Sequence, residues 1–522
     1  MGKLNLNLEQ IRSCRESAAR IAQAVMGFAQ RRSTVSIERA ILRLLGVAGA
    51  DETEVPYVNR LVTCLVEKGW LQDGVAIHVG HAAVTNKMSL EETLHGLVEG
   101  DLTFSSLRGE EMAPARRFIK DACARRWNAI EDRLAERDAR RRALGERSGA
   151  LAYVLTATGD VYEDVRHAEA VAQHGGDIVA VIRSTAQSLL DYVPYGPTRE
   201  GYGGTFATQE NFRIMRQALN QWCEKNGRYV RLSSFSSGLC MPEIAAMGAL
   251  EGLDNMVNDA LYGILYRDIN MERTLIDQAF SRAINGAARI VINTGEDNYL
   301  RTADPLQAAP SVVVSQMINF EMARRCGLPP ELIGIGNAFE IPPEVENGLL
   351  LEWAQALLTR ELFPSSPVKY MPPTHYVDGN LFRTHACDTL FNLITVATRQ
   401  GIQTIGVPTE GIFTPHIHDR VLALECVNYV KTTAKGLFDD IKFVDGGIVQ
   451  MRAQQVLREA EALLRAIAEG DGGLFGAIES GAFGDVRRSR ESGRGREGVF
   501  LRGERYVNPF ESIFAQTSHE PY

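Results

Sequence analysis

Polar side chains gather at the carboxyl ends of several segments that have the composition of buried β-strands. The first group is RSTAQS at 183–188, which combines a guanidinium, an amide and three hydroxyls. It opens a long connection that also carries Tyr192 and the glycine-rich run GYGG at 201–204. Arginine, hydroxyls and backbone N–H groups are common ligands of a phosphate. A surface loop without function is the alternative, but the length of the connection favours binding.

Later segments supply groups suited to an aromatic ring and to an amino acid. Ser237 ends a predicted strand, where its hydroxyl can contact a neutral or weakly basic ring nitrogen. Tyr262 is placed to stack on such a ring, although core packing is the common alternative for an aromatic residue in an apolar run. Arg267 and Asp297 suit an α-carboxylate and an α-ammonium group, or equally a salt bridge with each other.

Strand alternation decides where Tyr262 and Arg267 belong. On one strand the two side chains would point to opposite faces, so we predict a strand at 254–260 and place both residues in the loop after it. Further polar residues stand at the other predicted strand ends, namely Thr156, Ser236, Asn337, Glu340, Thr374 and Glu410. Each alone is an ordinary loop residue, and their concentration at successive strand ends favours a site.

The pair His416 and His418 could place two imidazoles on one face of a strand. It follows the last predicted strand, and no aspartate or cysteine supplies a matching third ligand. We therefore interpret it as structural and predict no metal site.

The elements that must position these residues alternate between strand and helix after residue 150. The predicted strands are 151–159, 177–184, 229–237, 254–260, 288–296, 331–340, 368–373 and 403–411. Amphipathic helices are predicted between them, for example at 208–226, 242–253, 270–287, 305–326 and 343–361. Eight such units predict a (β/α)₈ TIM barrel with its site at the carboxyl ends of the strands. An open doubly wound sheet is the alternative, but TATGDVYED fits its glycine-rich phosphate turn poorly.

Helical regions flank the predicted barrel. We expect an N-terminal helical region at 1–150, the barrel at 151–420, and a C-terminal helical region with a tail at 421–522. The stretch 113–146 is interpreted as a solvated helix with i,i+4 ion pairs, because its acids alternate with arginines. The tail segment GDGGLFGAIESGAFGDVRRSRESGRGREG is rich in glycine, arginine and serine, and we expect a loop there rather than a nucleic-acid arm.

Composition narrows the class of protein. The net charge of −9 argues against bulk nucleic-acid binding. The N-terminus lacks the apolar stretch of a secretory signal, and no apolar run approaches the ~18 residues of a membrane span. The eight cysteines are scattered without a CxxC pair, which is typical of reduced thiols in a cytoplasmic protein. These features predict a cytoplasmic enzyme that binds neither membrane nor nucleic acid.

Several long motifs resemble the α subunit of lysine 5,6-aminomutase. They are YVLTATGDVYED, AVIRSTAQSLLDYVPYG, EGYGGTFATQENFRIMR, SSGLCMPEIAAMGALEGLD, NDALYGILYRDINMERTLIDQAFSR and INTGEDNYLRTAD. The similarity runs from STVSIERAILRLLG near the N-terminus to YVNPF near the end, so it covers nearly the whole chain. Ornithine 4,5-aminomutase is the neighbouring family and the main competing interpretation.

The resemblance implies an isomerase of lysine degradation, which moves the terminal amino group of D-lysine or L-β-lysine from carbon 6 to carbon 5 by radical chemistry. It implies pyridoxal phosphate on this chain, and a smaller β subunit that carries adenosylcobalamin and the Schiff-base lysine. It also implies a heterotetramer of two α and two β subunits.

Site roles follow from the same motifs. The cofactor is expected to contact Arg183, Ser184, Gln187, Ser188 and Tyr192. Ser237 is expected to face the pyridine nitrogen, and Tyr262 to stack on the ring. Arg267 and Asp297 are expected to hold the carboxylate and the α-amino group of the substrate, and with Tyr262 they form the implied catalytic set. Ser184 stands where the family has threonine, which keeps the hydroxyl.

The lysines offer a check on this division of labour, because a pyridoxal enzyme needs one to hold its cofactor. Only nine lysines occur, and Lys225 and Lys369 alone fall within the predicted barrel. We expect Lys225 on a helix and Lys369 near the start of its strand, at the wrong end of the barrel. The DxHxxG motif of cobalamin binding is also missing. Both absences favour a partner subunit, although a non-catalytic pyridoxal phosphate-binding scaffold would share them.

Overall fold

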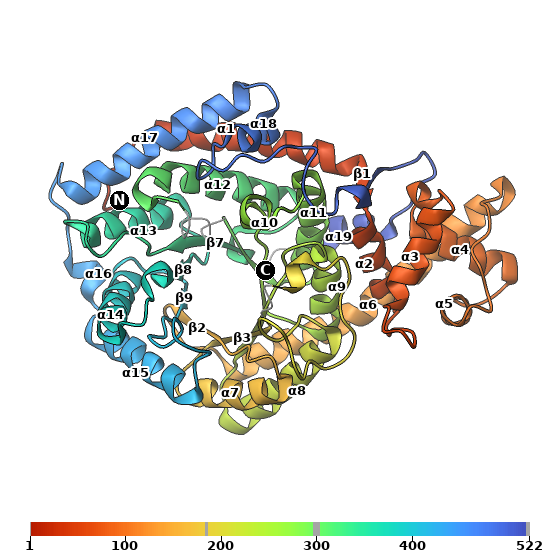
Figure 1. The fold of residues 1–522 in the computed structure, drawn as a ribbon, viewed down its shortest axis with the longest axis horizontal. Coiled ribbons are helices and arrows are strands. Elements are labelled where there is room, and N and C mark those ends of the chain that lie inside the picture. Colours follow the sequence, from red (N-terminus) through yellow and green to blue (C-terminus); the bar gives the residue numbers. More distant parts are fainter. Residues whose placement is uncertain (1, 183–185, 296–302, 518–522) are drawn as a thin grey trace.

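A closed barrel of eight parallel strands forms the centre of the molecule (Figure 1). The computed structural model describes residues 2–182, 186–295 and 303–517. Each strand pairs with the next in chain order, and the last strand pairs with the first, as Tyr153 does with Thr404. The strands are β2 (Leu151–Leu155), β3 (Ile178–Ile182), β4 (Arg231–Phe235), β5 (Asn255–Val257), β6 (Val291–Thr294), β7 (Ile333–Ala338), β8 (Lys369–Met371) and β9 (Ile402–Thr404). The predicted TIM barrel is therefore confirmed.

The strands are shorter than the predicted runs because only their apolar centres pair. The run 403–411, for example, contributes only its first two residues to β9, which begins at Ile402, and then continues as a loop through Pro408, which has no N–H for a strand ladder. The carboxyl ends of the strands therefore give way early to polar loops.

An outer layer of helices covers the barrel. The helices are α7 (Val161–Gln173), α8 (Gln209–Asn226), α9 (Met241–Glu251), α10 (Leu261–Arg267), α11 (Met271–Ala287), α12 (Pro305–Arg325), α13 (Gly348–Leu362), α14 (Leu381–Ala397) and α15 (Ile417–Thr433). Their ends follow local signals. Thr208 caps α8 by accepting from the Asn211 N–H, and Gly227 ends the same helix with φ 65°.

Further helices pack around this layer. They are α1 (Leu8–Gln30), α2 (Val35–Leu45), α3 (Tyr57–Glu67), α4 (Val75–Asn86), α5 (Leu90–Glu99), α6 (Gly109–Leu144), α16 (Leu437–Asp440), α17 (Ile448–Glu469), α18 (Gly473–Ser480) and α19 (Pro509–Thr517). Figure 1 shows α1 and α17 side by side across α12 along the top, while α3, α4 and α5 project at the right-hand side. None of the helices in these described ranges is long and apolar enough to cross a membrane.

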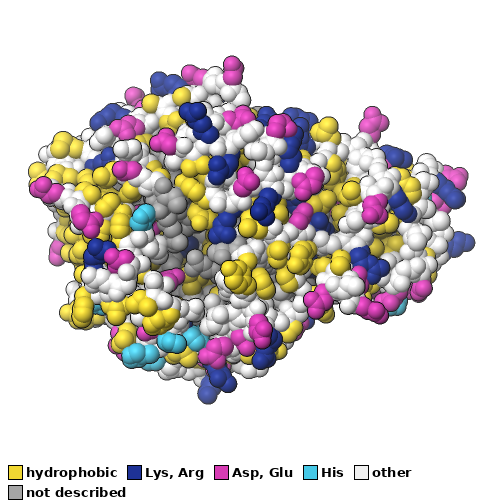
Figure 2. Space-filling model, viewed as in Figure 1, with side chains coloured by type: hydrophobic (Ala, Val, Ile, Leu, Met, Phe, Trp, Pro, Cys, Tyr) yellow, Lys and Arg dark blue, Asp and Glu magenta, His cyan; other side chains and the backbone are white. Residues whose placement is uncertain are grey.

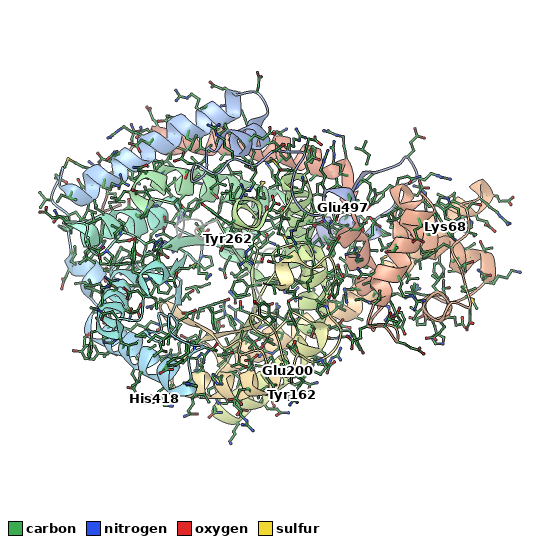
Figure 3. All side chains as sticks on the ribbon, viewed as in Figure 1. Lys68, Tyr162, Glu200, Tyr262, His418 and Glu497 are labelled. Atoms are coloured by element: carbon green, nitrogen blue, oxygen red, sulfur yellow. The ribbon has the colours of Figure 1, made fainter. Side chains whose placement is uncertain are left out.

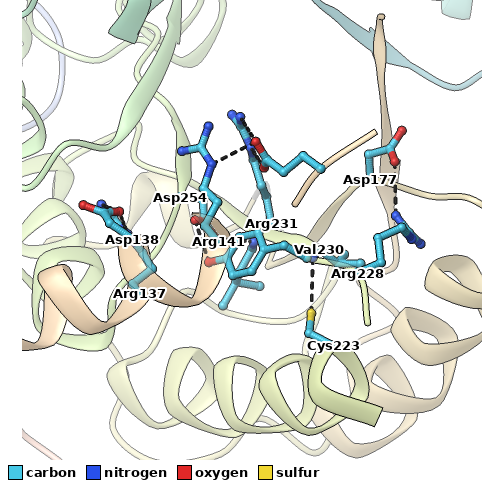
Figure 4. A network of polar contacts seen from close by, with 12 residues as sticks. Arg137, Asp138, Arg141, Asp177, Cys223, Arg228, Val230, Arg231 and Asp254 are labelled. Carbon is cyan, nitrogen blue, oxygen red and sulfur yellow. Dashed lines mark hydrogen bonds and ion pairs between the residues drawn. The ribbon is translucent and has the colours of Figure 1, made fainter. Parts of the chain in front are cut away.

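Helix α6 braces the amino-terminal end of the barrel (Figure 4). Arg137 on α6, which Figure 4 shows beside Asp138, donates to the Leu253 carbonyl just before β5, at 2.6 Å. Glu146, just after α6, binds Arg231 at the start of β4 through both carboxylate oxygens, at 2.6 and 2.9 Å. The helix was predicted correctly, but its ion pairs run mainly to other elements and not to i,i+4 neighbours.

The C-terminal tail is more ordered than its composition suggests. The expected loop, at 470–498, contains α18, and it is followed directly by β10 (Val499–Leu501), which pairs antiparallel with β1 (Arg32–Thr34). The loop prediction was wrong for α18, where Phe475 packs edge-on against Phe28 of α1, a partner far away in the sequence.

Figure 2 shows acidic and basic side chains interspersed over the visible face of the molecule.

Candidate active site

A pocket with about 1080 Å³ of space opens at the carboxyl ends of the barrel strands. Strand ends and the loops after them both contribute to its wall. The lining includes Tyr153, Leu155, Ser188, Phe235, Ser237, Gly238, Val257, Asp259, Tyr262, Arg267, Lys369, Met371, Thr374, Thr404 and Glu410. Ser188, Ser237, Tyr262 and Arg267, which come from three separate connections, thus meet at one pocket as the sequence suggested.

Ser188 and Ser237 are brought together by a close contact between two loops. Ser188 lies in the short 3₁₀ helix η2 (Gln187–Leu189), and its carbonyl accepts from the Leu239 N–H at 3.2 Å. Gly238 has φ 84°, and a Cβ at this position would lie 2.6 Å from the Ser188 Cα. Only glycine tolerates both the left-handed backbone and this approach. The glycine therefore fixes the distance between the two hydroxyl-bearing loops.

Other described residues that were predicted to bind a phosphate are not among the residues that line this pocket. Gln187 is 4% exposed, and its side-chain amide makes two hydrogen bonds with the backbone of Ala207, at 2.6 and 3.0 Å. It thereby holds the long connection after β3. Tyr192 is 41% exposed and is not among the residues that line the pocket. Arg183, Ser184 and Asp297 lie outside the described residues.

Tyr262 and Arg267 lie on the short helix α10 and not in a loop, which corrects the sequence prediction. The apolar run around them fits helix and strand patterns equally, so its end could not be placed by alternation. The Arg267 guanidinium lies 5.6 Å from the centre of the Tyr262 ring. Figure 3 shows Tyr262 inside the ring of helices, whereas Tyr162, Glu200 and His418 lie at the outer edge. The short helix thus presents a ring face and a cation to the same pocket.

Lys369 is a site residue that sequence reasoning placed wrongly. It begins β8, as predicted, but its side chain lines the pocket, and its Nζ lies 5.2 Å from the centre of the Tyr153 ring. The register pairs Lys369 with Ile402 of β9, and Met371, two residues further along β8, lines the same pocket. A lysine inside a buried strand is rare unless it has a partner or a function, and that signal could have identified it.

The opposite wall of the pocket carries hydroxyl and acidic groups. Thr374 belongs to η5 (Thr374–Tyr376) and donates to the Glu340 carboxylate at 3.2 Å. The Thr404 hydroxyl is buried and has no hydrogen-bond partner among the described residues. Burial, and then the charge of Glu410, raise the pKa of the nearby Asp388 carboxyl to about 7. This wall therefore offers hydrogen-bonding groups to a ligand in a weakly solvated environment.

His416 has a structural explanation, whereas His418 is an exposed residue in the first turn of α15. His416 begins α15, where Asp419 accepts from its backbone N–H at 2.8 Å in a capping box. No cluster of three or more potential metal ligands occurs in the part of the chain that the structure describes.

Fold and site together define the class of protein. The chain is a TIM barrel with a polar pocket at the end where barrel enzymes carry their active sites. The pocket combines hydroxyls, an aromatic face, a guanidinium and an ammonium group, a set suited to a flat ligand with anionic groups.

Comparisons with known proteins identify the family. Residues 4–513 match the family model described as D-lysine 5,6-aminomutase TIM-barrel domain of alpha subunit. The chain is 48% identical to the lysine 5,6-aminomutase alpha subunit of Fusobacterium nucleatum and 46% identical to that of Acetoanaerobium sticklandii, over 98% of this chain and of each relative. It is 28% identical to the D-ornithine 4,5-aminomutase subunit beta of Acetoanaerobium sticklandii, over 70% of this chain and 51% of that relative. The chain therefore belongs to the family of lysine 5,6-aminomutase α subunits.

Proposed function

We propose that this chain is the pyridoxal phosphate- and substrate-binding subunit of an adenosylcobalamin-dependent lysine 5,6-aminomutase. The reaction moves the terminal amino group of D-lysine or L-β-lysine from carbon 6 to carbon 5. The observation that carries the proposal is the convergence of Ser188, Ser237, Tyr262 and Arg267 on one pocket. The family and the 46–48% identity to named lysine 5,6-aminomutase alpha subunits support it.

The pocket residues fit pyridoxal phosphate chemically. Tyr262 offers a ring face for stacking, and Ser237 offers a hydroxyl for a ring nitrogen. The buried Thr404 hydroxyl, which has no partner among the described residues, is ready to bind a polar atom of a ligand. Ser188 and the segment before it would hold the phosphate, together with Arg183 and Ser184. Gln187 and Tyr192 belong to the same proposed cofactor set, and Gln187 also holds the loop through its hydrogen bonds to the backbone of Ala207.

Within the reaction, the residues of this chain bind and orient the reactants. Bound pyridoxal phosphate would supply the π-system through which nitrogen migrates, and adenosylcobalamin the radical that starts the migration. Arg267, at the end of α10, holds the substrate carboxylate by a charge-assisted hydrogen bond, and Asp297 holds the α-ammonium group. Buried walls such as Val257 and Met371 keep water away from reactive species.

A partner subunit is part of the proposal. It would bring the cobalamin and the lysine that holds the cofactor covalently, in an assembly of two α and two β subunits. The resemblance supports this assignment, whereas the count of lysines no longer does, because Lys369 lines the pocket of this chain. A cytoplasmic location remains an expectation, based on eight cysteines that are all free.

Co-expression with the neighbouring open reading frame tests the proposal. Turnover of D-lysine, L-β-lysine and D-ornithine would be measured with both cofactors, with and without the partner. We expect turnover of D-lysine or L-β-lysine only when the partner is present. Ornithine turnover alone would move the chain to the neighbouring family, and activity of the isolated chain would contradict the two-subunit assignment.

The scaffold alternative is tested in the same assay by Arg267→Met. A scaffold that only binds the cofactor would keep full turnover, whereas a substrate-binding subunit would lose most of it.

A further inference from the structure

The segment Arg488–Gly498, here called the C-terminal strap, lies against the helix that carries two of the pocket residues. Arg488 donates to the Ile264 carbonyl at 3.3 Å and also to the Leu265 carbonyl. Both carbonyls belong to the last turn of α10, where a helix of seven residues leaves its final C=O groups without internal partners. A guanidinium at this end also complements the helix dipole. Arg488 thus caps the helix that presents Tyr262 and Arg267.

The strap is also joined to the chain directly after α10 through backbone contacts. The Arg494 N–H donates to the Asp268 carbonyl at 2.7 Å, and the Asn270 N–H donates to the Arg494 carbonyl at 3.0 Å. The side-chain amide of Asn270 donates to the backbone carbonyls of Arg490 and Ser492, at 2.9 and 2.7 Å. Gly493 permits this approach, since it has φ 95° and a Cβ there would lie 2.7 Å from the Asn270 nitrogen.

A second set of bonds connects the strap to the Ser188 and Ser237 side of the pocket. Arg273 on α11 is fully buried, and its guanidinium donates to the Gly495 carbonyl at 3.0 Å. The same guanidinium donates to the Asp191 carboxylate at 3.0 Å and to the Leu239 carbonyl at 2.8 Å. Asp191 and Leu239 follow Ser188 and Ser237 by three and two residues. The guanidinium therefore ties both serine-bearing loops to the strap.

The Asp191 carboxylate is held as an anion between two arginines. Arg39 on α2 donates to the same carboxylate oxygen as Arg273, at 2.9 Å. Burial raises the pKa of this carboxyl, but the charges of Arg273 and Arg39 outweigh burial, so the pKa lies below its usual value. The ion pair persists at neutral pH and couples the N-terminal region to the same loop.

We propose that the C-terminal strap positions the pocket walls, and that Arg488 is the positioning residue for α10. The composition of the strap then has a physical reason, because arginine caps helix carbonyls and glycine allows close backbone contact. The ligands whose binding depends on this positioning are the amino-acid substrate, through Arg267, and the cofactor, through Tyr262, a point that rests on the proposed function.

The test compares Arg488→Ala with Arg487→Ala, its exposed neighbour of the same type. Hydrogen–deuterium exchange of the α10 amides is measured in the full chain, together with the melting temperature. We expect exchange at least about tenfold faster within α10 in Arg488→Ala only, with a melting temperature equal to that of the control. In the complex with the partner, the dissociation constants of the substrate and of pyridoxal phosphate are both expected to rise, that of the substrate about tenfold, because α10 carries Arg267 as well as Tyr262.

Arg488→Lys is the conservative variant. An ammonium group can still donate to one carbonyl, so its α10 exchange and substrate affinity should lie between those of wild type and Arg488→Ala. It also provides a milder change should Arg488→Ala fail to fold.

Two outcomes would overturn the proposal. The first is α10 exchange in Arg488→Ala equal to that in Arg487→Ala. The second is faster exchange throughout the chain with a lowered melting temperature, which would make the strap a general stabiliser. The exchange experiment needs no turnover, so a failure of the proposed function, seen as no reaction with any of the three amino acids, is distinguishable from a failure of the strap.

Discussion

The backbone of Gly238 packs directly against the backbone of Ser188, so that the loops after β3 and β4 meet at the edge of the pocket. A Cβ at Gly238 would lie 2.6 Å from the Ser188 Cα, and the Leu239 N–H donates to the Ser188 carbonyl at 3.2 Å. These two loops carry the serines assigned here to the phosphate and the ring nitrogen. Their spacing depends on the missing side chain of one glycine.

Gly238→Ala should therefore weaken cofactor binding. The added methyl group pushes Ser188 outward, and we expect the dissociation constant of pyridoxal phosphate to rise about tenfold, measured by absorbance titration. Gly227→Ala is the matched control, because Gly227 also has positive φ but its Cβ would meet open space. An equal effect of both variants would show that backbone strain alone, and not the contact with Ser188, is responsible.

Lys369→Met should lower the affinity of the pocket for anionic ligands. An ammonium group inside a weakly solvated pocket attracts carboxylate and phosphate groups, so its loss is expected to raise the substrate KM about tenfold or more. Lys225→Met on the exposed part of α8 is the control.

The same lysine allows a second measurement on the isolated chain. With pyridoxal phosphate and borohydride, mass spectrometry should find no pyridoxyl group on Lys369 if the partner supplies the covalent lysine. Labelling of Lys369 would instead assign that role to this chain.

The barrel was predictable because its information is local. Each β/α unit can be recognised in the sequence by a short apolar run followed by an amphipathic helix pattern. Helix α8, for example, begins and ends within a residue of its predicted bounds. The strand ends then indicated Ser188, Ser237, Tyr262 and Arg267 as neighbours, since carboxyl ends of parallel strands meet. The long sequence motifs also indicated the protein family.

The features that could not be predicted depend on the direction of a side chain or on contacts with residues that are distant in the sequence. Lys369 was judged by its place along the strand, whereas its side chain lines the pocket together with that of Met371, two residues further along β8. The short helix α10 lies in a run that fits two periodicities. The ordered tail depends on pairing between β1 and β10, and no local composition reveals such a contact.

Arg267→Met should reduce substrate binding through the carboxylate alone. Loss of a charged hydrogen bond of about 1.5–3 kcal/mol predicts a fall of about 10- to 100-fold in kcat/KM for D-lysine. 1,5-Diaminopentane, which lacks the carboxylate, should inhibit the variant and wild type equally. Arg142→Met, an exposed site at the other end of the barrel, is the control. A parallel loss of diamine affinity would show that Arg267 acts on the whole pocket.

The stability of the N-terminal region should decrease in acid because of a buried histidine. His78 on α4 is 2% exposed, its Nε2 lies 3.2 Å from the Trp70 carbonyl oxygen, and its Nδ1 has no hydrogen-bond partner among the described residues. Burial lowers the pKa of His78 from 6.5 to about 4. Between these values the unfolded chain binds a proton that the folded chain does not. Stability is therefore complete above pH 6.5 and falls as the pH drops toward 4, by roughly 3 kcal/mol for this group.

His78→Phe should flatten this dependence, because phenylalanine fills the same space between Trp70 and Phe104 and takes up no proton. Denaturant unfolding at a series of pH values between 4 and 7 measures the change in slope. Some dependence should persist, since burial also lowers the pKa of His167 to about 4. The exposed His418, changed to glutamine, serves as the control and should leave the slope as in wild type. A slope unchanged in His78→Phe would mean that the imidazole is protonated equally in the folded and unfolded chains, so that its burial does not exclude the charged form.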